Sequence, residues 1–147
     1  MRVVFSESWP RQSPLRRLAF SMVKRAERQP IVLLVDTDPN SRVSLCRLLA
    51  ESNIRTLVAT NSVAALSVLK SQKVDVLICE DLGGLYGVEM FEACEALFPE
   101  VRRVYLARKA SAELHCEMMV RGRVHGTVSE LMHPVDVRDL VAKLVRR

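Results

Sequence analysis

The sequence is poor in aromatic residues and lacks closely spaced cysteine pairs and long apolar runs. Of its 147 residues, four are cysteine and 5% are aromatic. The cysteines are widely spaced and form no CxxC pair, so we expect neither a zinc site nor a redox motif, but reduced thiols in a cytoplasmic protein. No apolar run reaches the roughly 18 residues that a membrane-spanning helix requires, so we predict no transmembrane segment.

The first 30 residues lack a secretory signal, although they are basic. No apolar stretch of roughly 7–15 residues with a small-residue cleavage site follows the early Arg and Lys residues. Residues 1–30 carry seven Lys or Arg against Glu7 and Glu27, a net charge of +5, whereas residues 31–147 carry fifteen of each sign. The basic residues therefore belong to an N-terminal extension, and we predict no DNA-binding surface on the neutral remainder.

Within this extension, the segment Ser13–Arg28 has the pattern of an amphipathic basic helix. Apolar residues recur on one face of it, namely Leu15, Leu18, Ala19, Met22 and Val23. The basic residues lie elsewhere around the helix, namely Arg16, Arg17, Lys24, Arg25 and Arg28. Such a helix can dock on its own domain, a partner protein, an anionic membrane or a nucleotide, and the sequence leaves these alternatives open.

Strand and helix patterns alternate five times after Pro30, and we assign residues 31–147 to one domain. Short runs rich in leucine and β-branched residues predict strands at Ile31–Val35, Ile54–Thr60, Val74–Cys79 and Val101–Ala107, and a short fifth strand within His125–Leu131. Apolar residues at helical spacing predict helices from Pro39 to about residue 52 and at Ser62–Ser71, Val88–Phe98, Ser111–Arg121 and Pro134–Arg146. The alternation predicts an α/β fold, a flavodoxin-like doubly wound five-stranded parallel sheet, with an extra N-terminal helix.

In such a sheet, ligands and chemistry lie at the carboxyl ends of the strands. Polar residues follow four of these ends, in the strings Asp36-Thr37-Asp38-Pro39, Glu80-Asp81, Ala107-Arg108 and His133-Pro134. Other matching features lie between them, namely the Ala65-Leu66 pair, Asp75, Gly84, Gly87 and Gly126. This ordered series resembles the receiver domain of two-component response regulators over residues 31–147, and it implies a role in signal transduction.

The resemblance implies a phosphorylation site made of five groups. Two acidic residues after the first strand help to hold Mg²⁺, and an Asp after the third strand accepts a phosphoryl group. A Thr or Ser after the fourth strand and a Lys before the last helix complete the site. This sequence keeps the first acidic residue as Asp36 but departs at the other four positions, which hold Thr37, Glu80, Ala107 and His133.

These departures all weaken the implied chemistry. Mg²⁺ demands near-ideal oxygen geometry, so the carboxylate lost at Thr37 predicts weak or absent Mg²⁺ binding. The longer Glu80 moves the attacking oxygen by on the order of 1 Å, which can cost about a hundredfold in rate. Ala107 lacks the hydroxyl, and His133, expected to face Asp36 and Glu80, lacks a permanent charge. We therefore expect a degenerate, phosphorylation-incompetent pseudo-receiver that is not an enzyme and holds no cofactor.

Such a domain acts through contacts with other proteins. The resemblance implies signalling partners, such as a histidine kinase or an effector, and a homodimer through the family's fourth helix, fifth strand and fifth helix. The predicted partner-binding residues are Met118, Met119 and Met132 near that face, and Arg16 and Arg17 in the extension. We expect a stand-alone domain, without a DNA-binding or catalytic output domain after Arg147.

Two alternatives remain open on the sequence alone. One is a true receiver that is phosphorylated at Glu80 or at Asp81. The other is an effector that binds a cyclic dinucleotide through the arginines of the basic extension. The sequence also leaves open whether Glu80 mimics a phosphorylated acceptor, because its carboxylate extends further from the strand than that of Asp.

Overall fold

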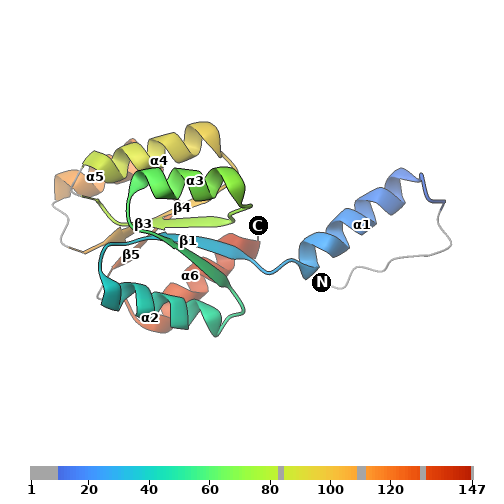
Figure 1. Cartoon of the computed structure of the whole chain (residues 1–147), viewed down its shortest axis with the longest axis horizontal. Coiled ribbons are helices and arrows are strands. Elements are labelled where there is room, and N and C mark those ends of the chain that lie inside the picture. The colour runs from blue at the N-terminus through green and yellow to red at the C-terminus, as the bar shows by residue number, and fades with distance from the viewer. Residues whose placement is uncertain (1–9, 83–84, 109–111, 130–131, 147) are drawn as a thin grey trace.

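The computed structural model describes residues 10–82, 85–108, 112–129 and 132–146. In chain order the elements are α1 (Pro14–Glu27), β1 (Ile31–Val35), α2 (Pro39–Ala50), β2 (Arg55–Ala59), α3 (Ser62–Ser71), β3 (Val76–Cys79), α4 (Leu85–Leu97), β4 (Arg102–Ala107), α5 (Ala112–Val120), β5 (Gly126–Ser129) and α6 (Pro134–Arg146). The strands form one sheet with helices on both faces, and α1 projects away from this domain (Figure 1). No helix in the described part of the chain is long and apolar enough to cross a membrane.

The five strands run parallel in the order β2-β1-β3-β4-β5. The chain places β2 on one side of β1, then crosses to the other side and continues outward through β3, β4 and β5. Helices α3, α4 and α5 cover one face of the sheet, and α2 and α6 cover the other (Figure 1). This is the flavodoxin-like doubly wound order, so the predicted fold class is confirmed.

Two apolar layers, one on each side of the sheet, form the core. The strands β1 and β3 are almost wholly buried, which explains their unbroken apolar sequences. Leu33 and Leu77 belong to the layer under α3, α4 and α5, whereas Leu34 and Ile78 belong to the layer under α2 and α6. All four side chains are fully buried, and burying one such side chain contributes about 1.5–3 kcal/mol.

α2 and α3 begin at the predicted residues, Pro39 and Ser62, and each is preceded by a side-chain cap. Asp38 precedes Pro39, and its Oδ1 accepts a hydrogen bond from the backbone N–H of Asn40 at 3.0 Å. Asn61 likewise accepts a hydrogen bond from the backbone N–H of Ala64 at 2.8 Å. Each cap satisfies an N–H group that has no partner inside its helix, so the chain turns sharply from β1 into α2 and from β2 into α3.

Several observed boundaries differ from the predicted ones. α4 begins at Leu85 rather than Val88, because Gly87 lets its first turn pack closely against the loop before it. The backbone N–H of Gly87 donates to the carbonyl oxygen of Asp81 at 2.8 Å, and a Cβ on Gly87 would lie only 2.6 Å from that oxygen. The strands β2, β3 and β4 are shorter than predicted, and β5 is a short strand inside the predicted range His125–Leu131. The predicted helix start Ser111, the predicted strand end Leu131 and the loop residue Gly84 lie outside the described residues.

α1 lies within the predicted helix Ser13–Arg28, and a polar anchor follows it. Arg28 Nη2 forms an ion pair with Asp75 Oδ1 at 2.6 Å, and Arg28 Nη1 donates to the carbonyl oxygen of Lys73 at 3.0 Å. The second oxygen of Asp75 accepts a hydrogen bond from the backbone N–H of Ile31 at 2.8 Å. The Asp75 carboxylate therefore joins the end of the extension to the start of β1.

Candidate functional site

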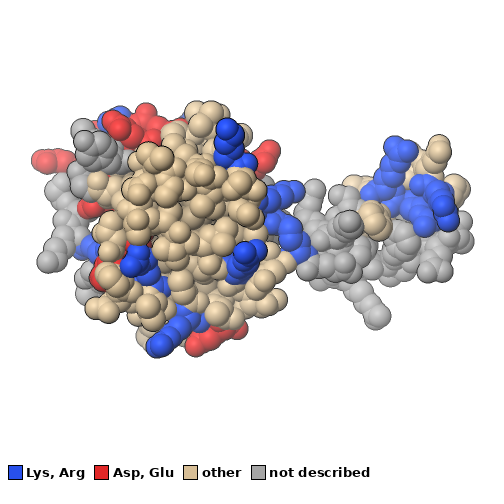
Figure 2. Space-filling view, in the orientation of Figure 1, with Lys and Arg blue, Asp and Glu red and all other residues tan. Residues whose placement is uncertain are grey.

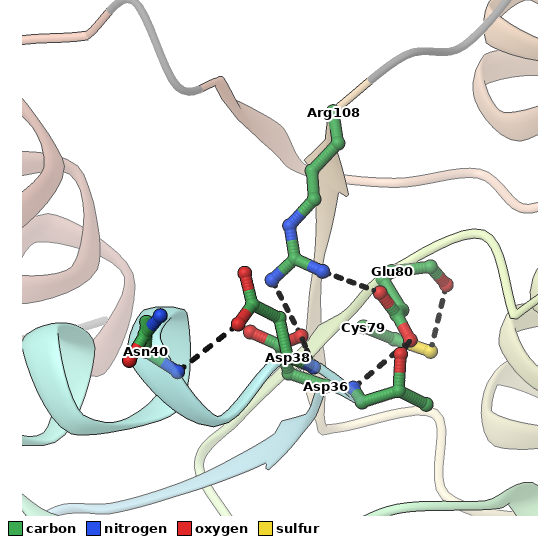
Figure 3. Close-up of polar contacts among 7 residues, drawn as sticks. Asp36, Asp38, Asn40, Cys79, Glu80 and Arg108 are labelled. Atoms are coloured by element: carbon green, nitrogen blue, oxygen red, sulfur yellow. Dashed lines mark hydrogen bonds and ion pairs between the residues drawn. The ribbon is translucent and has the colours of Figure 1, made fainter.

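Three adjacent strands bring charged residues together at the carboxyl edge of the sheet. β1 and β3 are neighbours, and their last residues, Val35 and Cys79, lie opposite each other. Asp36 and Glu80 directly follow these strands, and Arg108 follows the next strand, β4. Figure 3 shows the guanidinium of Arg108 pointing toward the carboxylates of Asp36 and Glu80.

Arg108 forms ion pairs with both carboxylates. Its Nη2 lies 2.5 Å from Asp36 Oδ1, and its Nη1 lies 2.8 Å from Glu80 Oε2. Asp36 is fully buried, Glu80 is 7% exposed, and the Arg108 side chain is 18% exposed. Partial burial lowers the pKa of Arg108, but the hydrogen bond to Asp36 and the charges of Asp36 and Glu80 outweigh it and raise the pKa above its usual value. The site therefore contains its own permanent cation.

Thr37 engages the other oxygen of Glu80. Its backbone N–H donates to Glu80 Oε1 at 3.0 Å, and its hydroxyl donates to the same oxygen at 2.6 Å. With Arg108 on Oε2, both carboxylate oxygens of Glu80 accept charge-assisted or hydroxyl hydrogen bonds. Thr37 thus acts here as a hydrogen-bond donor that holds Glu80 in place.

The residues at this site do not fit the Mg²⁺ that the family's chemistry uses. One oxygen of Asp36 already accepts hydrogen bonds from Arg108 and from the backbone N–H of Asp38, the latter at 2.9 Å. Its other oxygen is buried and has no hydrogen-bond partner among the described residues. Nowhere in the described chain do three or more His, Cys, Asp or Glu residues form a group that could hold a metal ion. The guanidinium of Arg108 supplies positive charge beside these carboxylates instead.

The cysteine beside the site is kept protonated. Burial, followed by the negative charges of Glu80 and Asp81, raises the pKa of the Cys79 thiol well above its usual value. The thiol donates to the backbone carbonyl oxygen of Glu80, with the sulfur 3.2 Å from that oxygen (Figure 3). Since the thiolate is the reactive form of cysteine, Cys79 acts as a packing residue.

An open pocket of about 330 Å³ adjoins Glu80. Its lining is mainly polar and comprises Thr37, Thr60, Asn61, Ser62, Glu80, Asp81 and Leu82. The pocket lies between the start of α3 and the end of β3, so a small phosphodonor could reach this edge of the sheet. The pocket therefore leaves Glu80 within reach of small molecules, while both of its carboxylate oxygens are held by Thr37 and Arg108.

The last two predicted site positions, Ala107 and His133, contact neither carboxylate in the described structure. Ala107 is half-buried and packs on the apolar layer under α5. His133 is exposed, and its Nδ1 accepts a hydrogen bond from the backbone N–H of Val135 at 3.2 Å, at the start of α6. The cationic contacts expected of His133 are made by Arg108, because β4 ends directly beside β3.

The predicted partner-binding residues differ in accessibility. Met118 is fully buried in the core layer under α4 and α5, so its assignment to a binding surface is wrong. Met132 is partly buried against the opposite layer, and Met119 is 46% exposed. On α1, Arg17 is exposed and Arg16 is half-buried. The spacing of apolar residues does not predict which of two adjacent methionines faces inward. In the structure, Met118 packs in the same core layer as residues of α4.

Arg108 is the site residue that the sequence analysis missed. The sequence places it directly after Ala107, at a strand end where the fold gathers polar groups. Four acidic residues cluster in the strings around Asp36 and Glu80, and the family's Lys is replaced by His133. A search for the cation that balances these acids would have led to Arg108, because it is the nearest basic residue at any of those strand ends.

The comparisons with known proteins agree with this geometry. The model of the response regulator receiver domain family matches residues 32–145. The doubly wound fold, together with this family match, defines the chain as a signalling domain of the receiver type. The chain belongs to the response regulator receiver domain family.

Solved structures show the same fold at low sequence identity. The signal receiver domain of an HD domain-containing protein from Pseudomonas fluorescens Pf-5 matches with a TM-score of 0.75 and 21% identity, covering 81% of this chain and 88% of that chain. A response regulator from Thermotoga maritima matches with a TM-score of 0.74 and 16% identity, covering 82% and 100%. A CheY-like receiver domain protein from Methanospirillum hungatei JF-1 matches with a TM-score of 0.73 and 17% identity, covering 81% and 95%. No curated protein matches the chain.

Proposed function

We propose that this chain is a pseudo-receiver, a receiver domain that signals without phosphorylation, through contacts with other cytoplasmic signalling proteins. The observation that carries the proposal is the pairing of Arg108 with both Asp36 and Glu80. In this arrangement the acceptor position is occupied by a carboxylate whose two oxygens are already bound. The function of such a domain lies in the surface that it presents.

Phosphoryl transfer from this arrangement faces three obstacles. The nucleophilic oxygen must point in line at the phosphorus, whereas Thr37 and Arg108 orient the oxygens of Glu80 toward themselves. The transferred group adds about −1.5 to −2 charges beside the remaining acidic residues. Charge on the transferred oxygens must also be neutralised, and Thr37 stands where a second metal-binding carboxylate would be needed. These obstacles together favour a site that stays unmodified.

A small-phosphodonor assay tests this proposal. The full chain is incubated with acetyl phosphate and Mg²⁺, and intact-mass spectrometry measures phosphoryl adducts, with a phosphorylatable receiver as positive control. We expect no adduct on the wild-type chain. The matched variant combines Thr37→Asp, Glu80→Asp and Arg108→Ala, and it should regain measurable Mg²⁺ binding by calorimetry. An adduct on wild-type Glu80 or Asp81 would instead identify a phosphorylatable receiver.

The partner surface that we favour is the outer side of α5. Met119 and Val120 are 46% and 75% exposed there, and α5, β5 and α6 are the counterparts of the family's implied dimer face. Exposed apolar side chains of this kind suit an adaptable protein interface. The partners proposed are a histidine kinase, an effector or a second copy of the chain. A pull-down with Met119→Glu should recover less partner, with or without phosphodonor.

A further inference from the structure

The described side chains of α1 leave an apolar face exposed. Leu15, Leu18 and Met22 follow one another at spacings of three and four residues, so they lie on one side of the helix. Their exposed fractions are 65%, 58% and 41%. Since α1 projects away from the domain, the sheet and its covering helices do not bury this face (Figure 1). Ala19, on the same side of the helix, is buried, so the exposed apolar area consists of the three larger side chains. Large exposed apolar side chains grouped in this way mark a binding surface.

α1 also carries a net positive charge. Its sequence holds four Lys or Arg residues and one acidic residue, Glu27, a net charge of +3. Arg17 and the preceding Arg11 are exposed, and the first turn holds no acidic residue. Figure 2 shows blue side chains gathered over the end of α1 that lies farthest from the domain. The body of the domain is neutral, so this positive charge is confined to the extension.

We propose that α1 binds the surface of a bilayer that contains anionic lipid. A helix with an apolar face, a basic polar face and low overall hydrophobicity lies in the plane of the membrane interface. In that position Leu15, Leu18 and Met22 enter the boundary of the acyl chains, while the arginines contact the anionic headgroups. The binding is reversible and peripheral, because α1 offers only a few large apolar side chains.

A second copy of the chain fits this face less well. Pairing two α1 helices would bring together two sets of like charges, with Glu27 as the one acidic residue on each helix. A helix of 14 residues is about 21 Å long and supplies only two heptads of apolar contact. A nucleic acid would use the arginines but would leave the apolar face in water. An anionic bilayer accepts both faces at once.

The place where α1 joins the domain suits this use. The anchor between Arg28 and Asp75 lies at the start of β1, whereas the Asp36–Arg108–Glu80 cluster follows the opposite ends of the strands. A bilayer bound at α1 therefore approaches the amino ends of the strands and leaves the carboxyl edge, with its charged cluster, uncovered.

Vesicle cosedimentation of the full chain tests the proposal. Sucrose-loaded vesicles of phosphatidylglycerol and phosphatidylcholine are compared with vesicles of phosphatidylcholine alone. We expect at least about tenfold tighter binding to the anionic vesicles, weakening as salt is raised. Leu18→Glu should lower the affinity for anionic vesicles by at least about tenfold, because it removes an apolar anchor and adds repulsion.

The matched control is Val63→Glu, which introduces the same charge at a 79% exposed apolar position near the start of α3, at the opposite edge of the sheet. It should bind anionic vesicles like the wild type, and circular dichroism should show both variants folded. Absence of binding to anionic vesicles, or equal binding by Leu18→Glu, would refute the proposal. Light scattering supplies a further check, since a dimer that Leu18→Glu abolishes, without vesicle binding, would assign the face to a second copy.

Discussion

At the scale of single residues, Arg108 carries the charge balance of the strand-end site. Replacing it with Ala would leave Asp36 and Glu80 buried without their cation. Removing one partner of a buried ion pair costs about 3–5 kcal/mol, and because Arg108 is partly exposed we expect the free energy of unfolding to fall by about 2–3 kcal/mol. Urea denaturation at neutral pH measures this loss.

The control for that measurement is Arg123→Ala. Arg123 forms an ion pair with Glu95 at 2.9 Å, but its side chain is 69% exposed. Exposed ion pairs contribute about 0–1 kcal/mol, so this variant should lose at most that amount. If Arg108→Ala and Arg123→Ala lowered the free energy of unfolding equally, the ion pairs of Arg108 would stabilise the fold no more than an exposed ion pair does.

Tyr105 links stability to alkaline pH. Burial, with the charges of Asp81 and Cys79, raises the pKa of Tyr105 to about 12, compared with about 10 for an exposed tyrosine. The unfolded chain therefore loses this proton first, and the free energy of unfolding falls as pH rises from about 10 to about 12. Tyr105→Phe should reduce this fall. It should cost little at neutral pH, because the hydroxyl is buried with no hydrogen-bond partner among the described residues.

The readout is the difference in unfolding free energy between about pH 8 and about pH 11 for wild type and Tyr105→Phe. Burial also raises the pKa of Cys94 to about 11, so the phenylalanine variant keeps part of the alkaline loss. An identical alkaline loss in both proteins would show that the hydroxyl of Tyr105 is not held protonated by the fold.

At the scale of elements, the strands and helices were predictable, whereas the contacts between them were not. The unbroken apolar runs of β1 and β3 admit only a buried strand, and Asp38-Pro39 marks a helix start. The early start of α4 depends on the approach of Gly87 to Asp81, which is a contact between a helix and a loop. The role of Arg108 depends on the neighbouring strand toward which its long side chain extends. Neither contact can be predicted from the spacing of apolar residues along the sequence.

The close approach of Gly87 in α4 to the loop before it leaves no room for a side chain. A Cβ at this position would meet the backbone of Asp81 at 2.6–2.8 Å, and backbone atoms cannot swing aside. We expect Gly87→Ala to lower the free energy of unfolding by about 1–3 kcal/mol through overpacking. The control is Gly126→Ala, whose Cβ would meet the side chain of Leu140 at 3.1 Å. That side chain can move, so the control should lose less; a larger loss for Gly126→Ala would contradict the argument.

At the scale of the whole molecule, polar contacts of Arg28 and Gln29 connect the extension to the domain in the described structure. α1 projects from the sheet domain, and the contact that follows it is the ion pair between Arg28 and Asp75 (Figure 1). Removing residues 1–27 keeps this ion pair, so we expect the melting temperature to change by at most about 2 °C. Arg28→Ala in the full chain should lower it more, by about 2–4 °C.

Thermal unfolding followed by circular dichroism measures both changes. The comparison separates the helix from its anchor, because the truncation deletes α1 and the substitution deletes only the ion pair. A truncated chain that melts well below Arg28→Ala would mean that α1 packs on the domain, which would weaken the case for a free helical arm.

The pairing of Arg108 with Asp36 and Glu80 has a consequence for how information passes through such a protein. A receiver that is switched by a transferable group stores a recent event in its covalent state, and it resets when that group is lost. Under the function proposed above, this chain has no such memory. Its message is set by how many copies the cell makes and by where those copies sit. Control then falls on synthesis, degradation and placement.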